Sequence, residues 1–309
     1  MVINPNGKAG IMAGDWRRTG TWRDMTGKVV LLTGATRGIG RACASAVASS
    51  GATLVVTGRS QSRLDSLIDE LRAVEGCGEV SGLLADLAIQ DEVRALADEF
   101  KSRHDRLDVL INNAGAIFSS RQESADDIEY TWALNHNGYY LLTTLLSDLL
   151  RASAPARIIS TASAAHEMGK MVFDDLQYDN RRYGSGWSSY CQSKLANILF
   201  TRELSRRLEG TGVTANCIHP GFVSTGFGKN NGALMRFSML ISRPVQRSPT
   251  RGAESLVWGA LSEEAEGVTG EYLYNCKPKK PTRRARSDED AARLWSLTEE
   301  MTGTENTWD

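Results

Sequence analysis

Tyr190 and Lys194 carry the most direct chemical signal in the sequence, because they stand four positions apart in a segment with helical periodicity. Residues at this spacing project from one face of a helix, so both side chains should reach the same space. A phenol titrates near ~10, and a neighbouring ammonium group favours the phenolate, which brings the phenol toward working pH. Tyr190 could then donate a proton to a nascent alkoxide or remove one from an alcohol. The spacing alone is common, so its meaning depends on the motifs around it.

A glycine-rich segment, Thr33–Gly40, indicates where a second reactant could bind. It stands where the first expected strand becomes the first expected helix, the place where an open α/β sheet binds its ligand. Gly34 would allow a tight turn, Gly38 a close approach of backbone to pyrophosphate, and Gly40 close packing of helix on strand. The helix N-terminus would supply N–H donors. The alternative is a turn of this composition that binds nothing.

Two arginines bear on which dinucleotide would bind. Arg59 directly follows the second expected strand, and no acidic residue occupies the end of that strand. Arg37 lies within the glycine turn. An acidic residue there would accept from the ribose 2′-OH of NAD, whereas arginines can pair with the 2′-phosphate of NADP. The sequence therefore predicts NADP(H), the alternative being that both arginines are solvated surface charges.

An alternation of strands and helices must position these residues. From Lys28 onward, short β-branched runs alternate with longer amphipathic ones. The expected strands are 29–33, 53–57, 80–84, 107–111, 156–160, 213–218 and one near 272–274. The expected helices start at Ile39, Ser62 and Asp91 and cover 128–150, 188–208, 252–261 and 289–300. The predicted fold is α/β, with a single doubly wound, Rossmann-like parallel sheet, helices on both faces and a small lid.

Composition sets the domain organisation. The 309 residues, 41% of them hydrophobic, suffice for one large core, which we expect to span residues 27–309 after an irregular arm at 1–26. The segment 226–248 has Gly, Met and Pro without clean periodicity, and we expect it to form a mobile lid. The formal net charge of -1 gives no reason to expect nucleic acid or an anionic membrane as a partner, so small molecules are the expected partners.

Cysteines, histidines and hydropathy indicate the compartment. The five cysteines are an odd number without a CxxC pair, which favours reduced thiols in the cytoplasm. The start of the chain lacks a signal-peptide pattern, and no run of about 18 apolar residues occurs, so neither secretion nor a transmembrane segment is expected. The four histidines lack metal-ligand spacing, and no metal site is predicted.

A further motif, Leu110–Gly115 with the sequence LINNAG, follows the fourth expected strand. Together with the glycine turn, Tyr190-x-x-x-Lys194 and Pro220-Gly221, in that order, it resembles the short-chain dehydrogenase/reductase superfamily over roughly residues 27–275. The resemblance implies hydride transfer between a nicotinamide dinucleotide and an alcohol or carbonyl compound. The oxidised nicotinamide ring would then favour the Tyr190 phenolate together with the ammonium group.

The resemblance also implies roles for individual residues. Ser163 matches the serine that hydrogen-bonds the substrate oxygen, with Ser160 as a competitor that should lie within the strand. Asn135 matches the asparagine that holds a water between Lys194 and solvent, unless it makes only a structural hydrogen bond. The implied catalytic residues are Asn135, Ser163, Tyr190 and Lys194.

On the cofactor side, Asp86 matches the position at the adenine ring, with a helix N-cap before Asp91 as the alternative. Val223 and Thr225 match residues that grip the nicotinamide carboxamide and diphosphate. The implied cofactor-binding residues are Gly34, Thr36, Arg37, Gly38, Ile39, Gly40, Arg59, Asp86, Leu87, Asn113, Ala114, Gly115, Tyr190, Lys194, Pro220, Gly221, Val223 and Thr225.

The distance of 27 residues from Ser163 to Tyr190 narrows the resemblance, because it is about twice the distance common in the superfamily. This long insertion and the segment Ser193–Phe200 are similar to the retinol dehydrogenase and WW-domain oxidoreductase branch, which implies NADP preference and retinoid, steroid or lipid aldehyde substrates. We expect neither the membrane anchor with which many retinoid enzymes of that branch begin nor WW modules, and this argues against a lipid substrate delivered at a membrane. The insertion's aromatic residues, Phe173, Tyr183 and Trp187, would line an apolar pocket or pack the insertion onto the domain.

Three further expectations complete the prediction. A catalytically silent dinucleotide sensor or scaffold is the alternative function, and it would be free to lose the four catalytic positions, all of which are filled.

The helices at 128–150 and 188–208 match those through which superfamily members pair, which implies a homodimer or homotetramer. Residues 277–286 contain six basic residues, expected to form a solvated loop rather than a site for an anionic partner.

Overall fold

A single sheet forms the centre of the computed structural model, which describes residues 21–223, 247–304 and 308. Within these residues the sheet has eight strands in the order β3-β2-β1-β4-β5-β6-β7-β8. The strands are β1 (Val29–Leu32), β2 (Thr53–Gly58), β3 (Val80–Leu84), β4 (Val109–Asn112), β5 (Ala156–Thr161), β6 (Val213–His219), β7 (Tyr272–Tyr274) and β8 (Lys277–Pro278). β1 to β7 are parallel and β8 is antiparallel to β7. The predicted doubly wound parallel sheet is confirmed, with β8 as an unpredicted edge.

The strand order creates a crevice beside the glycine turn. The chain moves outward from β1 to β3 on one side and from β4 to β7 on the other, so β1 and β4 are central neighbours. Ligands of open α/β sheets bind at the carboxyl ends of strands at such a reversal point. Gly34 follows β1 and Asn113 follows β4, so both motifs lie at this reversal point.

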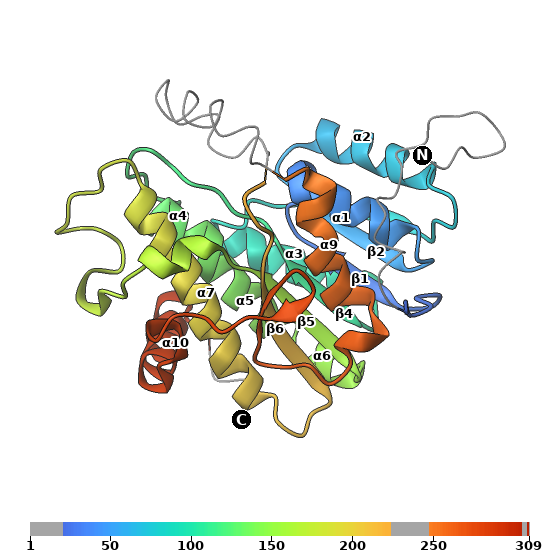
Figure 1. Ribbon diagram of the computed structural model, residues 1–309. Coiled ribbons are helices and arrows are strands. Elements are labelled where there is room, and N and C mark those ends of the chain that lie inside the picture. The colour runs from blue at the N-terminus through green and yellow to red at the C-terminus, as the bar shows by residue number, and fades with distance from the viewer. Residues whose placement is uncertain (1–20, 224–246, 305–307, 309) are drawn as a thin grey trace.

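Helices cover both faces of the sheet (Figure 1). They are α1 (Gly38–Ala48), α2 (Gln61–Arg72), α3 (Gln90–Arg103), α4 (Tyr130–Trp132), α5 (Gly138–Leu145), α6 (Ser147–Ala152), α7 (Trp187–Arg207), α9 (Pro249–Leu261) and α10 (Asp288–Thr302). Alternate strand residues feed two apolar clusters, because successive side chains of a strand point to opposite faces. Val30 and Leu32 join the cluster of α1, α2 and α9, whereas Val29 and Leu31 join that of α3, α5, α7 and α10.

The expected single helix over 128–150 is not continuous in the structure. The chain instead forms α4, a π-helical turn at Ala133–Asn137, α5 and α6, with Leu146 (φ −102°, ψ 9°) between the last two. A π-helical turn adds one residue to the helical repeat and commonly marks a functional site. Apolar periodicity could not reveal this turn, because Asn135 within it is hydrogen-bonded to Ala116 and Ser193, which stand 19 and 58 positions away in the sequence.

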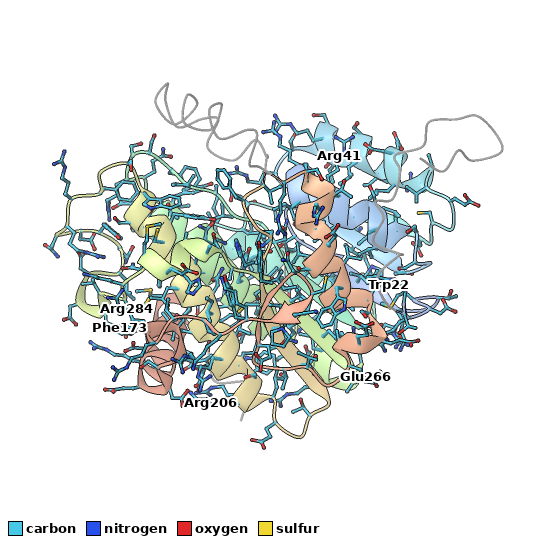
Figure 2. All side chains as sticks on the ribbon, viewed as in Figure 1. Trp22, Arg41, Phe173, Arg206, Glu266 and Arg284 are labelled. Carbon is cyan, nitrogen blue, oxygen red and sulfur yellow. The ribbon has the colours of Figure 1, made fainter. Side chains whose placement is uncertain are left out.

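The end of the expected N-terminal arm is tied to the domain. Arg23 N–H donates to Leu261 O at 2.9 Å, Met25 is 1% exposed, and Trp22 pairs with Ser262 in an isolated antiparallel bridge. Trp22 accordingly lies beside the C-terminal end of α9 (Figure 2). Residues 1–20 of the arm and 226–246 of the expected lid lie outside the described residues, whereas Arg247 and Ser248 at the end of the expected lid are described.

Helix α10 lies against α7 and the π-helical turn (Figure 1). The Trp295 ring is stacked on Phe200, with centroids 5.9 Å apart, and meets Tyr140 edge-on at 5.0 Å. His136 Nε2 and Thr298 Oγ1 are hydrogen-bonded at 3.0 Å. The chain's own C-terminal helix therefore occupies part of the helical surface through which pairing of copies was predicted.

Candidate active site

Tyr190 and Lys194 lie one turn apart on α7, as predicted, and both are buried, with 8% and 3% exposure. The helix starts after Gly186, whose φ of +73° and position against Phe118 O leave no room for a Cβ atom. Lys194 Nζ donates to Thr161 O at 2.9 Å and lies 5.7 Å from the centroid of the Tyr190 ring. The backbone at the end of β5 therefore fixes the ammonium group beside the phenol.

In the protein alone, burial opposes the expected lowering of the Tyr190 pKa. Burial raises the pKa of Tyr190 to about 12, and the hydrogen bond with Ser163 opposes this only in part. Burial also lowers the pKa of Lys194 to about 7. Removal from water disfavours the charged form of both groups, and this effect exceeds the attraction between phenolate and ammonium. The protein alone therefore favours the neutral phenol, the form that can donate a proton.

Ser163 lies just beyond β5, and its hydroxyl group is hydrogen-bonded to Tyr190. The Ser163 backbone is extended, and Oγ accepts from Ala165 N–H at 3.1 Å at the start of the 3₁₀ segment Ala164–Met168. Ser160 instead lies within β5, 1% exposed, in register with Asn112 and Cys217. The geometry therefore favours Ser163 over Ser160 as the partner of Tyr190.

Asn135 connects the loop after β4 to α7. Its Oδ1 accepts from Ala116 N–H at 2.9 Å, and its Nδ2 donates to Ala116 O at 2.9 Å and to Ser193 Oγ at 3.0 Å. Both N–H groups of the amide are thus used, which matches the structural alternative for this side chain. Gly115 fits between the two polar groups, since a Cβ there would lie 3.1 Å from Asn135 Oδ1 and 3.5 Å from Lys194 Nζ.

The glycine turn is shaped as expected for binding a diphosphate. Gly34 has φ +65°, and a Cβ there would lie 2.6 Å from Ala114 Cα. A Cβ on Gly40 would lie 2.2 Å from Gly34 O, so α1 can pack this closely on the turn only because residue 40 is glycine. α1 begins after Arg37 without a side-chain cap and without an acidic residue in its first turn. Its first N–H groups and the positive end of its dipole therefore suit a phosphate.

Asn113 supports this turn from the neighbouring strand. Its Nδ2 donates to Thr33 O at 3.0 Å and Gly34 O at 3.3 Å, and its backbone N–H donates to Thr33 Oγ1 at 2.9 Å. Ala114 N–H donates to the same Thr33 hydroxyl at 3.1 Å. The predicted cofactor residue Asn113 thus shapes the turn with its side chain.

Arg59 is held in a polar triad with Asp86 and Tyr130. Its Nη1 donates to Asp86 Oδ2 at 3.0 Å and to Tyr130 OH at 3.1 Å, and Tyr130 OH donates to Asp86 Oδ2 at 2.5 Å. The N-cap alternative for Asp86 is wrong, because α3 begins after Ile89 and Asp86 Oδ1 instead accepts from Ala88 N–H. Sequence analysis missed Tyr130, whose partners stand 44 and 71 positions away.

The remaining predicted cofactor residues border the same crevice or support it. Thr36 faces the end of β2, where a Cβ on Gly58 would lie 2.8 Å from its Cγ2, and Ile39 faces Gly252 of α9. Leu87 is buried, and its carbonyl faces Gly138 of α5. Gly38 begins α1 with φ +55°.

The segment after β6 forms the opposite wall. Gly221 follows the buried Pro220 with φ +85°, and Val223 is 8% exposed and bridged to Arg247. Thr225 lies outside the described residues.

The three insertion aromatics have different surroundings. Trp187 is 38% exposed, and its ring centroid lies 5.6 Å from that of Tyr190. The Phe173 ring lies under the Arg293 guanidinium at 4.5 Å, on the side of α10 (Figure 2), and Tyr183 OH donates to Glu129 at 2.8 Å. Trp187 therefore lies beside Tyr190 and stays partly exposed, whereas Phe173 and Tyr183 pack the insertion.

Glu129 is a support residue that the sequence did not reveal. It is fully buried and caps α4, with its carboxylate accepting from the N–H groups of Thr131 and Trp132. The carboxylate also accepts from Tyr183 OH and from Ser189 Oγ, each at 2.8 to 2.9 Å. One side chain thereby ties the insertion and the start of α7 to the helix that leads to Asn135.

The basic segment 277–286 forms β8, a loop and a short 3₁₀ turn, and all six basic side chains are exposed. Lys279 Nζ lies 3.5 Å from the Glu167 carboxylate, and Arg284 donates to Gly169 O at 3.1 Å. Over the described ranges no helix has the length and apolar character needed to cross a bilayer. The same ranges hold no group of three or more His, Cys, Asp or Glu side chains placed to bind a metal ion.

The chain is similar in sequence to a known protein family and to two human proteins. Residues 28–234 match the family described as short chain dehydrogenase. Human retinol dehydrogenase 12 is 39% identical over 279 residues, which cover 90% of this chain and 87% of the relative. Human retinol dehydrogenase 14 is 39% identical over 303 residues, which cover 93% and 90%.

Solved structures agree with this relationship. An uncharacterised protein of Mycobacterium paratuberculosis superposes with a TM-score of 0.75 at 29% identity, covering 95% of this chain and 97% of that one. The RhlG/NADP complex of Pseudomonas aeruginosa superposes with a TM-score of 0.65 at 26% identity, covering 81% and 95%. A short chain dehydrogenase of Burkholderia cenocepacia in complex with NADP gives 0.64 at 27% identity, covering 81% and 97%.

Proposed function

The chain belongs to the short-chain dehydrogenase/reductase family, in its retinol dehydrogenase branch, and from that premise we propose that it interconverts an apolar alcohol and its aldehyde or ketone with NADP(H). The family makes it an oxidoreductase. The observation that carries the proposal is the meeting of Tyr190, Ser163 and Lys194 at the end of β5, beside the glycine turn at the reversal point of the sheet.

The proposed mechanism divides the chemistry between these side chains. Bound NADP(H) supplies or receives the hydride. Ser163 Oγ and Tyr190 OH hydrogen-bond the carbonyl oxygen, and the neutral Tyr190 phenol donates its proton as that oxygen becomes an alkoxide. Lys194, held by Thr161 O, stabilises the phenolate that remains. In the reverse direction the alcohol donates its proton to the Tyr190 phenolate, which the Lys194 ammonium group and the positive charge of the bound oxidised nicotinamide would favour.

The proposed cofactor rests on charge at the two ends of the adenosine site. The uncapped N-terminus of α1 suits the diphosphate, and Arg37 and Arg59 are the cations for a 2′-phosphate. Arg59 uses Nη1 for Asp86 and Tyr130, and a guanidinium carries N–H groups on two further nitrogens. Two similar solved structures are complexes with NADP, which agrees with this choice. A kcat/KM for NADH equal to or above that for NADPH would contradict it.

The proposed substrate is retinoid-like, a long apolar aldehyde or alcohol. Ile117, Ala165 and Cys191 form a buried apolar cluster with Tyr190, and Trp187 extends it toward solvent. The two human relatives are named retinol dehydrogenases, which favours a retinol-like substrate for this chain as well. We further propose that the enzyme works in the cytoplasm, which agrees with five free cysteines.

The decisive experiment follows NADPH absorbance with retinal, other apolar aldehydes, small polar aldehydes, ketones and quinones. Tyr190→Phe should abolish turnover and leave NADPH binding largely intact. Tyr140→Phe is the matched control, because Tyr140 is also buried but packs on Phe200 and Trp295. Undiminished kcat in Tyr190→Phe would remove the tyrosine from the mechanism. NADPH binding without turnover of any carbonyl would favour a silent sensor or scaffold instead.

A further inference from the structure

His219, the last residue of β6, joins the two loops that flank the reaction site. Its Nδ1 atom accepts from the N–H of Ala164 and from the N–H of Gly221, each at 3.3 Å. Ala164 directly follows Ser163, and Gly221 lies in the turn expected at the nicotinamide. One nitrogen atom thus ties the serine loop to the opposite wall of the crevice.

A second histidine acts on the same peptide group. His166 Nδ1 and Ser163 O are hydrogen-bonded at 2.7 Å, while Thr282 N–H approaches His166 Nε2 at 3.5 Å. Because Nε2 accepts there, Nδ1 carries the proton and donates to the carbonyl. Ser163 O and Ala164 N belong to one peptide bond, so His166 holds its C=O and His219 holds its N–H.

From these contacts we infer that His219 is a positioning residue, whose Nδ1 lone pair orients the Ser163–Ala164 peptide and keeps it in register with Gly221. This inference rests on the proposed function, in which Ser163 contacts the substrate oxygen. A displacement of about 1 Å in a site of this kind can reduce turnover by about 100-fold, so the orientation of this peptide bears directly on rate.

The ring of His219 is held in the state that the inference needs. An accepting Nδ1 requires the neutral tautomer with its proton on Nε2. Burial lowers the pKa of His219 to about 4, and the charges of Lys279, His166 and Arg247 act in the same direction. The ring is also stacked on Tyr274, with centroids 4.9 Å apart and an interplanar angle of 18°.

The outer side of the Gly221 turn is fixed separately by Arg247. Its N–H donates to Phe222 O at 2.7 Å, and its Nη2 donates to Tyr274 OH at 2.7 Å. A Cβ on Gly221 would lie 2.7 Å from Arg247 Cδ, so the turn lies directly against this side chain. Since Arg247 and Tyr274 brace the turn from outside, a change at His219 should affect its link to the serine loop without releasing the turn.

Two substitutions separate the hydrogen bonds of His219 from its packing. In His219→Phe the ring remains stacked but both N–H groups lose their acceptor. In His219→Asn the ring is lost but Oδ1 comes close to the place of Nδ1. We expect kcat to fall about 10- to 100-fold in His219→Phe and to stay within about 3-fold of wild type in His219→Asn, with the Kd for NADPH little changed in both. The same two substitutions at His104, where α3 ends, are the matched controls and should leave kcat unchanged.

A second measurement does not depend on turnover. Amide hydrogen exchange of the full chain should be faster at Ala164 and Gly221 in His219→Phe and near wild type in His219→Asn, and ¹⁵N NMR of the wild-type imidazole should show the proton on Nε2. The inference is overturned by an Nδ1–H tautomer, by unchanged exchange in His219→Phe, or by equal loss of kcat in both variants. If the wild-type chain reduces no carbonyl compound, the proposed function fails, while exchange and tautomer still test the bond pattern.

Discussion

Glu129→Gln provides a sharp test of how the insertion is held, because the substitution keeps the shape of the side chain. Oε1 of Glu129 accepts from Thr131 N–H and Tyr183 OH, and Oε2 accepts from Trp132 N–H and Ser189 Oγ. In glutamine one oxygen becomes NH₂. Whichever oxygen is replaced, one backbone N–H must then face another N–H donor and one hydroxyl group must turn to accept.

The magnitude follows from this exchange of donors and acceptors. A buried N–H without an acceptor costs about 1–3 kcal/mol, and the other bonds weaken because they no longer go to a carboxylate. We expect a loss of about 3 kcal/mol in the free energy of unfolding. For a chain of about 300 residues the unfolding entropy is roughly 0.6 kcal/mol/K, so Tm should fall by about 5 °C.

The assay is thermal unfolding followed by circular dichroism, together with steady-state kinetics. Because Ser189 directly precedes Tyr190, the KM for apolar aldehydes should also rise. Glu263→Gln, at an exposed glutamate, is the control and should leave both quantities unchanged. A Tm within 1 °C of wild type for Glu129→Gln would refute the claim that these four bonds hold the insertion in place.

Three further predictions concern the cofactor and the catalytic lysine. Gly40→Ala should abolish NADPH binding, measured by NADPH fluorescence, because the new Cβ would lie 2.2 Å from Gly34 O; retained binding would contradict the close packing of this turn. Arg59→Ala should lower kcat/KM for NADPH about 10- to 100-fold and leave that for NADH nearly unchanged, with the exposed Arg63→Ala as control; equal losses for both cofactors would count against a 2′-phosphate contact. Burial lowers the pKa of Lys194 to about 7 in the folded chain, whereas an unperturbed lysine has a pKa of about 10.4. Between pH 7 and about pH 10.4 the unfolded chain therefore binds a proton that the folded chain lacks, and the free energy of unfolding rises with pH. Lys194→Met should therefore lose turnover and gain stability relative to wild type in urea unfolding near pH 7, and that gain should shrink toward pH 10; a constant difference across this range would contradict the shift.

The sequence predicted the sheet well because buried parallel strands are continuous apolar runs. The strand limits at Val80–Leu84 and Tyr272–Tyr274 agree with expectation to the residue. β8 was missed because its two exposed residues, Lys277 and Pro278, have no apolar pattern, and the π-helical turn was missed because it depends on contacts made by Asn135 with distant backbone.

The residues of the candidate site that were predicted differ from those that were not in the same way. Tyr190, Lys194 and Ser163 come together as expected, since each stands at a fixed place relative to a predicted element. Glu129 and Tyr130 carried no sequence signal, because their roles arise only when segments 44 to 71 positions apart meet. The rise of the Tyr190 pKa on burial in the protein alone was not foreseen for a related reason, since burial of the pair cannot be read from its spacing.

The aromatic contacts of α10 have a consequence for handling the protein. In many symmetric enzymes a helical surface of this kind becomes dry only when two subunits associate, which makes their stability depend on concentration. Here Trp295 and Trp308, each 2% exposed, cover part of it from within the same polypeptide. A bulky fusion attached directly after Trp308 should therefore lower the unfolding midpoint.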